Sequence, residues 1–296
     1  MNTHRKTGFD RFYDVNGWTF VLTALLLIGL FMLYPIANSL WLSLHSGKGL
    51  VVKFVGLGNV MRLLHDPVFQ TALLNTLIFL VVQVPLMILL ALVTATCLNS
   101  DNLRWKGFFR TAIFLPCVTS LVAYSILFKS MFAYDGVVNS MLQLVGIVDD
   151  PIPWLSDPFW SRVTIICAIT WRWTGYNMIF YLAAMQNIDK SIYEAARLEG
   201  VTPRQAFFYI TIPLLKPVIL FTSVVSTIGT LQLFDEPMNI TAGGPANSTL
   251  TLSMYIYNLS FKFVPNFGYA ATVSYVIVIF AALLALVQFK FAKDRK

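Results

Sequence analysis

Two long stretches without a charged side chain constrain this sequence more than any other feature. Residues 15–47 and 67–100 contain no Asp, Glu, Lys or Arg. A helix needs about 20 apolar residues to cross the hydrocarbon core of a bilayer, so each stretch is long enough to span a membrane. Charged residues make up 12% of the chain, whereas soluble domains contain roughly 25%. The sequence therefore predicts a membrane protein.

Further apolar segments along the chain predict an all-α, polytopic protein with six transmembrane helices. The predicted spans cover residues 18–42, 71–98, 110–132, 161–186, 214–234 and 268–290. No polar stretch is long enough to form a separate soluble domain. We therefore expect one transmembrane domain over residues 18–292, preceded by a segment at 1–17 and followed by a tail at 293–296.

The distribution of Lys and Arg orients these spans, because cytoplasmic loops of membrane proteins are enriched in both. With the N-terminus in the cytoplasm, fourteen of the 21 basic residues lie on the cytoplasmic side and only Lys48, Lys53, Arg62 and Lys262 lie in outer loops. An even number of spans then places both termini in the cytoplasm. The basic residues flank apolar segments, so the net charge of +7 reflects membrane topology and does not indicate nucleic-acid binding.

Residues 187–213 form a polar loop between the fourth and fifth predicted spans, and their pattern predicts a helical hairpin. Ser191 and Glu194 match a capping box for a helix that starts at Ile192. Gly200 is a suitable terminator because glycine accepts left-handed geometry. Thr202, Pro203 and Gln205 match a second helix start. Pro213 is expected to mark the bend into the fifth span.

The same loop contains a specific motif. Glu194-Ala195-Ala196 is followed after three residues by Gly200, after nine more by Ile210, and then by Ile212-Pro213. This pattern resembles the EAA loop, EAA-x3-G-x9-I-x-LP, of permease subunits from ATP-driven, binding-protein-dependent importers, with Ile212 in place of Leu. In that family the loop docks on the ATPase. The resemblance assigns ATPase coupling to Glu194, Ala195, Ala196, Gly200, Ile210 and Pro213.

Segments on both sides of the loop resemble the carbohydrate-importing branch of that family. They are Trp171 to Ile188, Phe234-Asp235, and Thr241 to Thr249 with its Gly-Gly-Pro. The resemblance implies the type I importer (MetI-like) permease fold. It also implies a second six-helix permease, most simply as a heterodimer, two ATP-binding-cassette ATPase subunits and an extracytoplasmic solute-binding protein. The sequence has no G-x-x-x-x-G-K-[ST] phosphate loop, so ATP and Mg are expected on the partner ATPase and no cofactor in this chain.

Polar groups at membrane depth are the candidates for a substrate path, because they are costly there and usually face a cavity or the bundle interior. The candidates are Asn75, Gln83, Tyr124, Trp171, Arg172, Tyr176, Asn177, Ser226, Thr230 and Gln232. Aromatic rings beside hydroxyls and amides suit a sugar. The alternative for each residue is an interhelical hydrogen bond. Arg172 could pair with Asp235, meet a partner subunit or meet a sugar phosphate.

The outer loop of residues 235–262 is the expected contact surface for the binding protein, with Asp235, Gly243, Gly244 and Pro245 as candidates. The resemblance implies a transport subunit and no enzyme. An ion-coupled secondary transporter is the main alternative, but the predicted spans contain no clear acid. A membrane-embedded enzyme would need a convergent catalytic set, such as H-E-x-x-H, and the sequence has none.

Overall fold

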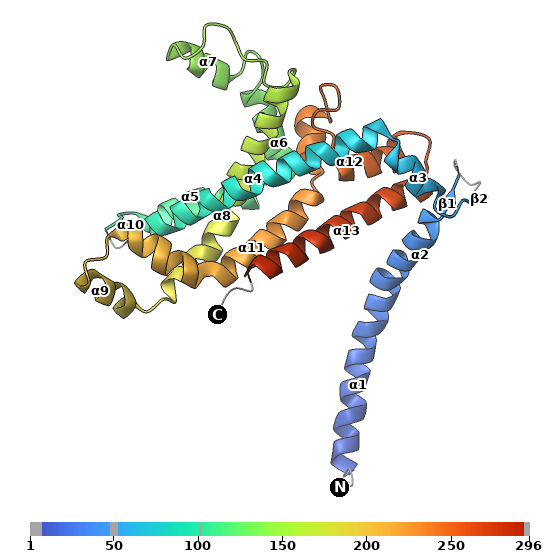
Figure 1. Cartoon of the computed structure of the whole chain (residues 1–296), viewed down its shortest axis with the longest axis horizontal. Helices are drawn as coiled ribbons and strands as arrows, with labels where there is room; N and C mark the ends of the chain where they lie inside the picture. Colours follow the sequence, from blue (N-terminus) through green and yellow to red (C-terminus); the bar gives the residue numbers. More distant parts are fainter. Residues whose placement is uncertain (1–7, 48–52, 101, 293–296) are drawn as a thin grey trace.

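The protein is an elongated helical bundle with a single long helix standing away from it (Figure 1). The computed structural model describes residues 8–47, 53–100 and 102–292. Residues 1–7 of the predicted N-terminal segment and the predicted tail 293–296 lie outside the described residues. The only sheet in the described chain is a two-stranded antiparallel pair, β1 (His45–Ser46) and β2 (Lys53–Phe54). The all-α prediction is confirmed.

Four helices in the described residues are long and apolar enough to cross a membrane: Gly17–Ser43, Pro67–Asn99, Pro203–Leu231 and Phe267–Phe291. The first contains α1 (Gly8–Ile28), the π-turn η1 (Gly29–Leu33) and α2 (Tyr34–Ser43). The second is α4 (Pro67–Asn99) and the last is α13 (Phe267–Ala292). The third joins α10 (Pro203–Ala206), the π-turn η2 (Phe207–Thr211) and α11 (Ile212–Leu231). These helices coincide with the first, second, fifth and sixth predicted spans.

The fourth predicted span is α8 (Pro158–Gln186), which has 29 residues. At 1.5 Å per residue it is about 43 Å long, which exceeds the ~30 Å hydrocarbon core. Arg162 and Arg172 make it less apolar than the other long helices, and both are held inside the chain. Arg162 Nε donates to the Ser248 carbonyl at 3.0 Å, and its Nη2 donates to Asn75 Oδ1 at 3.1 Å. Length and packing are compatible with six spans.

The prediction of one continuous third span at 110–132 is wrong. The segment forms two helices, α5 (Lys106–Val118) and α6 (Leu121–Met131), which meet at an angle of 100°. Pro116 has no amide hydrogen for the α5 ladder. Thr119 and Ser120 then adopt extended backbone conformations, with ψ of 153° and 131°. A broken helix leaves free carbonyls, and the structure satisfies these with a side chain from α8, as described below.

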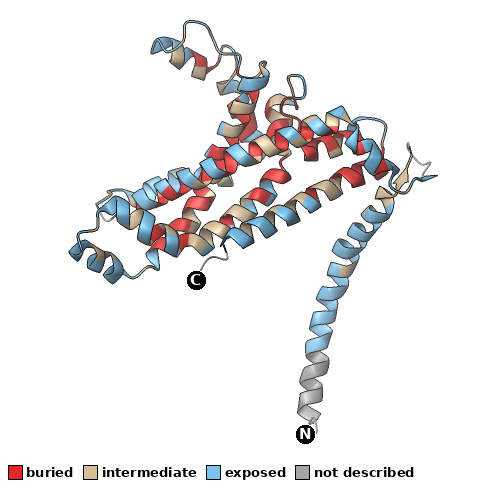
Figure 2. Cartoon of the chain, viewed as in Figure 1, coloured by how far each residue is buried: buried red, intermediate tan, exposed pale blue. Residues whose placement is uncertain are grey.

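The bundle core lies between α4, α8, α11 and α13, where the buried residues concentrate (Figure 2). Single hydrogen bonds tie the helices across this core. Tyr181 Oη and Thr222 Oγ1 are 2.6 Å apart, and Gln288 Nε2 donates to Thr227 Oγ1 at 2.8 Å. Gly175 brings α8 onto the α5 backbone so closely that a Cβ added there would lie 2.0 Å from the Ile113 carbonyl oxygen. Such small residues are typical of close helix contacts in membranes.

Among the described residues, the first span contacts the bundle near its C-terminal end, and most of its remaining apolar surface is exposed (Figure 2). Thr272 Oγ1 of α13 donates to the Ser43 carbonyl at 3.2 Å, and Tyr275 Oη donates to the Ile36 carbonyl at 2.8 Å. Gly268 permits this contact, because a Cβ there would lie 1.9 Å from the His45 carbonyl oxygen. Most of the first span is therefore left for lipid or for another protein chain.

A carboxylate organises the same end of the bundle. Asp66 caps α4, because its Oδ1 accepts from the amides of Val68 and Phe69 at 2.9 and 3.3 Å. Its Oδ2 accepts from the hydroxyls of Tyr255 and Tyr269. Burial alone would raise the pKa of Asp66, but these four hydrogen bonds outweigh it and hold that pKa below its usual value. Asp66 thus joins α4 to α12 (Leu252–Tyr257) and α13.

Besides α9 (Lys190–Leu198), four short helical elements complete the described chain. They are α3 (Gly58–Leu64), α7 (Val137–Leu144), η3 (Pro237–Thr241) and η4 (Asn258–Lys262). The helix α7 stands apart above the bundle, beyond α6 (Figure 1). The end of the bundle opposite α9 carries α3 and the strands. Asn139 of α7 fixes the loop that follows this helix. It accepts a hydrogen bond from Trp154 Nε1 at 2.9 Å and donates one to the Ile152 carbonyl at 2.9 Å.

Candidate functional site

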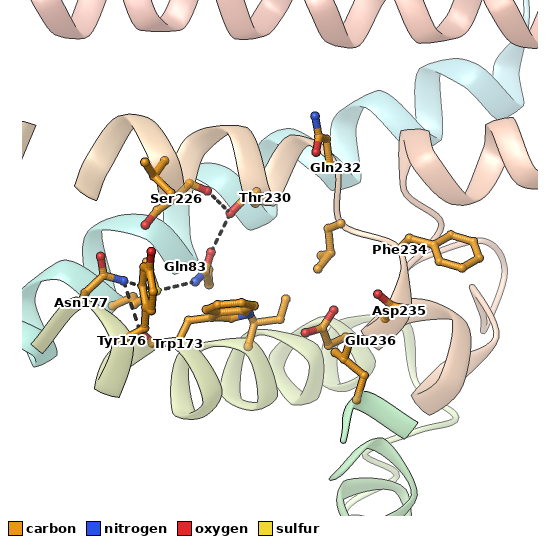
Figure 3. A pocket seen from close by; sticks show the side chains of 16 residues that line it. Gln83, Trp173, Tyr176, Asn177, Ser226, Thr230, Gln232, Phe234, Asp235 and Glu236 are labelled. Atoms are coloured by element: carbon orange, nitrogen blue, oxygen red, sulfur yellow. Dashed lines mark hydrogen bonds between the residues drawn. The ribbon is translucent and has the colours of Figure 1, made fainter. Parts of the chain in front are cut away.

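A cavity of about 510 Å³ lies between α4, α8, α11 and the segment that follows α11. Its volume falls in the range of small-molecule sites. Figure 3 shows polar and aromatic side chains from these elements converging on it. The polar and aromatic side chains that line it are Gln83, Trp173, Tyr176, Asn177, Ser226, Thr230, Gln232, Phe234, Asp235 and Glu236. Six of the ten predicted substrate-path residues are in this group.

The amides of the cavity are held by neighbouring side chains. Gln83 Oε1 accepts from the Thr230 hydroxyl at 3.0 Å, which joins α4 to α11. Asn177 Nδ2 donates to the Trp173 carbonyl at 3.2 Å and to Met87 Sδ at 3.4 Å. Asn177 is only 1% exposed, and its Oδ1 has no hydrogen-bond donor among the described residues. A buried acceptor without a donor costs about 1–3 kcal/mol.

Two carboxyl groups stand at one end of the cavity, directly after α11. Asp235 and Glu236 lie next to each other in Figure 3, facing the Trp173 ring across the cavity. Glu236 is 3% exposed, and this burial raises the pKa of its carboxyl, although the nearby Tyr124 hydroxyl opposes the shift. Sequence reasoning missed Glu236 as a cavity residue. Its position next to Asp235, just beyond a predicted span, is the signal that could have found it.

Arg172 does not line the cavity. It is 5% exposed, and its Nη2 donates to the carbonyls of Thr119 and Cys117 at 3.0 and 3.5 Å. These carbonyls end α5, where the helix dipole favours a cation. The guanidinium also lies 4.6 Å from the centre of the Tyr124 ring. Of the predicted alternatives for Arg172, an ion pair with Asp235 is not present in the described chain. Arg172 instead closes the break between α5 and α6.

Three other predicted path residues also lie elsewhere. Asn75 Nδ2 donates to the carbonyls of Asn247 and Leu250 at 2.7 and 3.0 Å, so it anchors the loop after η3. Tyr124 is buried in α6 beneath Arg172. Trp171 lies on the outer side of α8, where its ring is 5.3 Å from that of Phe128. These residues stabilise the helices that form the cavity wall.

The hairpin of residues 187–213 has the predicted helix–turn–helix form, with one correction. The first helix, α9, begins at Lys190 and is capped by Asp189, whose Oδ1 accepts from the Ser191 amide at 2.9 Å. The predicted Ser191–Glu194 box and the start at Ile192 are therefore wrong, because Asp189 is a competing cap two residues earlier. Glu194 is exposed and makes no capping bond, so its carboxylate remains available on the surface of α9.

The turn of the hairpin is confirmed in detail. Gly200 has φ of +78°, its amide donates to the Arg197 carbonyl at 3.1 Å, and the Val201 amide donates to the Ala196 carbonyl at 3.0 Å. This pair of bonds is a Schellman motif, which favours glycine at this position. Thr202 and Gln205 form the predicted second capping box, with Pro203 at the helix start. Tyr193 Oη, 2.9 Å from Thr211 Oγ1, ties α9 to η2.

No break in the helix occurs at Pro213, where the hairpin continues into the fifth span. Pro213 lies near the start of α11, and the helix continues through it from Pro203 to Leu231. The π-turn η2 precedes it and contains Ile210. A π-turn shifts the local hydrogen bonds and so accommodates the amide that proline lacks. The second arm of the hairpin and the fifth span are consequently one helix.

The predicted binding-protein candidates divide between the surface and the interior. Gly243 is buried, with φ of +83° and Met254 packed against it. Gly244 and Pro245 are half-buried, and the Thr249 hydroxyl donates to the Gly244 carbonyl at 3.1 Å. Asp235 lines the cavity. The part of this loop near Gly243 therefore contributes to packing, and Gly244 and Pro245 remain the outward-facing candidates.

Residues 55–293 match the family described as the binding-protein-dependent transport system inner membrane component. The chain belongs to this family. The permease is therefore a transport subunit and not an enzyme, and it lies in a membrane. Its cavity and its hairpin both lie within the residues that match the family.

Curated relatives of the permease agree with this assignment. The permease is 64% identical to the lactose transport system permease protein LacF of Rhizobium radiobacter, over 100% of both chains. It is 31% identical to the sulfoquinovosyl glycerol transport system permease protein SmoG of Agrobacterium fabrum, over 92% of this chain and 88% of that one. It is 28% identical to the trehalose/maltose permease protein MalF of Thermococcus litoralis, over 95% and 94%.

Solved structures share the fold. A chain of a bacterial importer of the acidic polysaccharide alginate superposes with a TM-score of 0.79 at 24% identity, over 96% of this chain and 97% of that one. A chain of a bacterial alginate transporter, solved with a pentasaccharide-bound periplasmic protein, gives 0.75 at 26% identity, over 96% and 94%. The MetI-like permease fold predicted from the sequence is confirmed.

Proposed function

We propose that this permease carries a carbohydrate across the cytoplasmic membrane through the cavity between α4, α8 and α11. The cavity is the observation that carries the proposal. Trp173, Tyr176 and Phe234 supply apolar aromatic surface, and Asn177, Ser226 and Gln232 supply hydrogen-bonding groups. A sugar has apolar ring faces and a polar rim, so both kinds of group are used by one ligand. Lactose is the first sugar to test, because it is the one named for the relative with 64% identity.

The hairpin is the proposed docking site for an ATPase that binds ATP and Mg. The side chains of Glu194 and Ala195 are exposed on α9, and Leu198 at its end is 90% exposed. Exposed apolar side chains beside polar ones are typical of a protein contact surface. Ala195 has no bulk to hold a partner away. Two such ATPases would serve this chain and a second permease.

The exposed first span and the outer loops leave room for the other proposed partners. A second six-helix permease could cover the apolar surface of residues 17–43, which the described chain leaves open. An extracytoplasmic binding protein would then deliver sugar on the side of the predicted outer loops, one of which contains α7. The excess of basic residues on the hairpin side supports a cytoplasmic position for the hairpin and for both termini.

The test is a mild-detergent pull-down of the tagged permease, combined with ATP-dependent lactose uptake in reconstituted vesicles. Glu194→Lys reverses the charge on the exposed face of α9, and Asp150→Lys makes a similar change in the loop after α7 as a control. We expect the wild type and Asp150→Lys to retain an ATPase and a second permease, and Glu194→Lys to lose the ATPase. Recovery of the chain alone, with uptake that needs an ion gradient and no ATP, would identify a secondary transporter instead.

A further inference from the structure

The cavity lining carries two carboxyl groups, those of Asp235 and Glu236, beside groups that can donate or accept, such as the hydroxyls of Tyr176 and Ser226 and the amide of Gln232. An ionised carboxylate only accepts hydrogen bonds. It is therefore matched by a ligand that offers hydrogen-bond donors. Sugar hydroxyls donate, whereas carboxylate, sulfate and phosphate groups are acceptors at neutral pH.

The charge of the cavity lining also favours a neutral ligand over an anionic one. None of the side chains that line it is a Lys or an Arg. Arg172 is the basic side chain whose charge opposes the rise in the pKa of Glu236 on burial. It lies outside the cavity, and its Nη2 donates to the carbonyls that end α5. Burial raises the pKa of Glu236, but even with this carboxyl protonated the lining carries Asp235 and no cation. In a poorly solvated site an unpaired anion is disfavoured strongly.

We infer that this cavity selects neutral, hydroxyl-rich saccharides and rejects anionic ones, and that Asp235 and Glu236 determine the selection. The inference rests on the proposed function, since it assumes that sugar passes through this cavity. It separates the permease from the superposed alginate importers, whose named cargo is an acidic polysaccharide. It also excludes sugar phosphates as cargo of this cavity.

Two probes of nearly equal shape isolate the charge. Methyl β-galactoside and methyl β-galacturonide differ only in a hydroxymethyl group that becomes a carboxylate. The importer complex in lipid nanodiscs, without a binding protein, would be loaded with radiolabelled lactose, and each probe would be used as competitor. We expect the uronide to compete at least about tenfold more weakly, since one unfavourable charge contact at an effective dielectric near 20 exceeds the free energy of a tenfold change.

The double variant Asp235→Asn/Glu236→Gln removes both charges, keeps the side-chain shapes and adds donors. It should bring the two probes close to equal competition. Asp149→Asn/Asp150→Asn makes the same change of charge on exposed residues of the α7 loop and should leave the wild-type ratio unchanged. If the double variant does not assemble, Asp235→Asn alone should reduce the ratio, because Asp235 is only half-buried.

Equal competition by the two probes in the wild type would overturn the inference, as would a ratio that Asp235→Asn leaves unaltered. These outcomes are distinct from failure of the proposed function. If the wild type binds no lactose, or if Trp173→Ala binds lactose as tightly as the wild type, the cavity is not the lactose site and both proposals fail. If lactose binds and the uronide competes equally, only the selection is wrong.

Discussion

The contact between α5 and α8 at Gly175 makes a quantitative prediction about assembly of the bundle. A Cβ at this position would lie 2.0 Å from the Ile113 carbonyl oxygen and 2.9 Å from the Phe114 Cα, whereas ordinary contacts begin at 3.4 Å. The clashing atoms belong to the backbone, so no side-chain rotation relieves them. Gly175→Ala therefore has to separate the two helices by more than about 1 Å, which is the shortfall from ordinary contact.

The free-energy change follows from comparison with a second glycine. Overpacking a filled helix contact costs about 1–3 kcal/mol. Gly→Ala also improves helix propensity by about 0.5–1 kcal/mol. Gly107 in α5 provides the matched control, because a Cβ there would have no neighbour within 4 Å. The propensity gain is common to both variants, so their difference in stability should equal the packing loss at Gly175.

The assay is the temperature at which the detergent-solubilised protein loses half of its monodisperse fraction, measured by fluorescence-detected size exclusion. Gly107→Ala should match or exceed the wild type, and Gly175→Ala should fall clearly below it. The displacement would also pull Arg172, one turn away on α8, from the carbonyls of Thr119 and Cys117. Equal half-loss temperatures for the two alanine variants would refute the close approach of α5 and α8.

Three further predictions concern single side chains. Arg172→Ala should lower the half-loss temperature, because hydrogen bonds from a charged donor contribute about 1.5–3 kcal/mol. It should leave lactose affinity unchanged. Weaker lactose binding in a stable variant would return Arg172 to the sugar path. Gly200→Val should reduce ATPase co-purification more than Gly200→Asn, since asparagine tolerates the left-handed conformation at φ of +78°; equal recovery of ATPase would contradict the Schellman turn. Asp66 has a lowered pKa in the folded protein, so the stability that its carboxylate contributes is present above its ordinary pKa of 3.8 and is lost as pH falls through the folded value. A thermal-stability profile from pH 7 to pH 3 should therefore show an acid-dependent loss of stability in the wild type that Asp66→Asn lacks.

Much of the fold could be predicted from the chain because the bilayer imposes simple requirements. The charge-free run at 67–100 becomes α4, and the predicted end at 98 differs from Asn99 by one residue. The broken third span shows the limit of this reasoning. Pro116 is visible in the sequence, but proline is tolerated in many transmembrane helices. The break at Thr119 is stable because Arg172, 53 residues away, satisfies the freed carbonyl, and no local pattern records that contact.

Part of the candidate site could also be predicted, because the bilayer makes polar residues costly and so makes them conspicuous in the sequence. Composition identified polar residues at membrane depth but could not say which way each one faces. Gln83 and Asn75 are both buried amides of α4; Gln83 lines the cavity, whereas Asn75 holds a loop through two backbone carbonyls. The difference depends on the packing of α4 against α8 and α11. Glu236 was missed because it lies beyond the predicted span and returns to the cavity through a turn.

The uninterrupted helix from Pro203 to Leu231 has a mechanical consequence. Its 29 residues extend from the hairpin turn to the cavity wall, where Ser226 and Thr230 lie near its far end. At 1.5 Å per residue the path along this helix is about 43 Å. Pro213, Pro217 and the π-turn η2 all lie in its first half, and such positions are where helices bend. A displacement of α9 would therefore reach the cavity-facing hydroxyls through one continuous helix whose bending positions lie toward the hairpin.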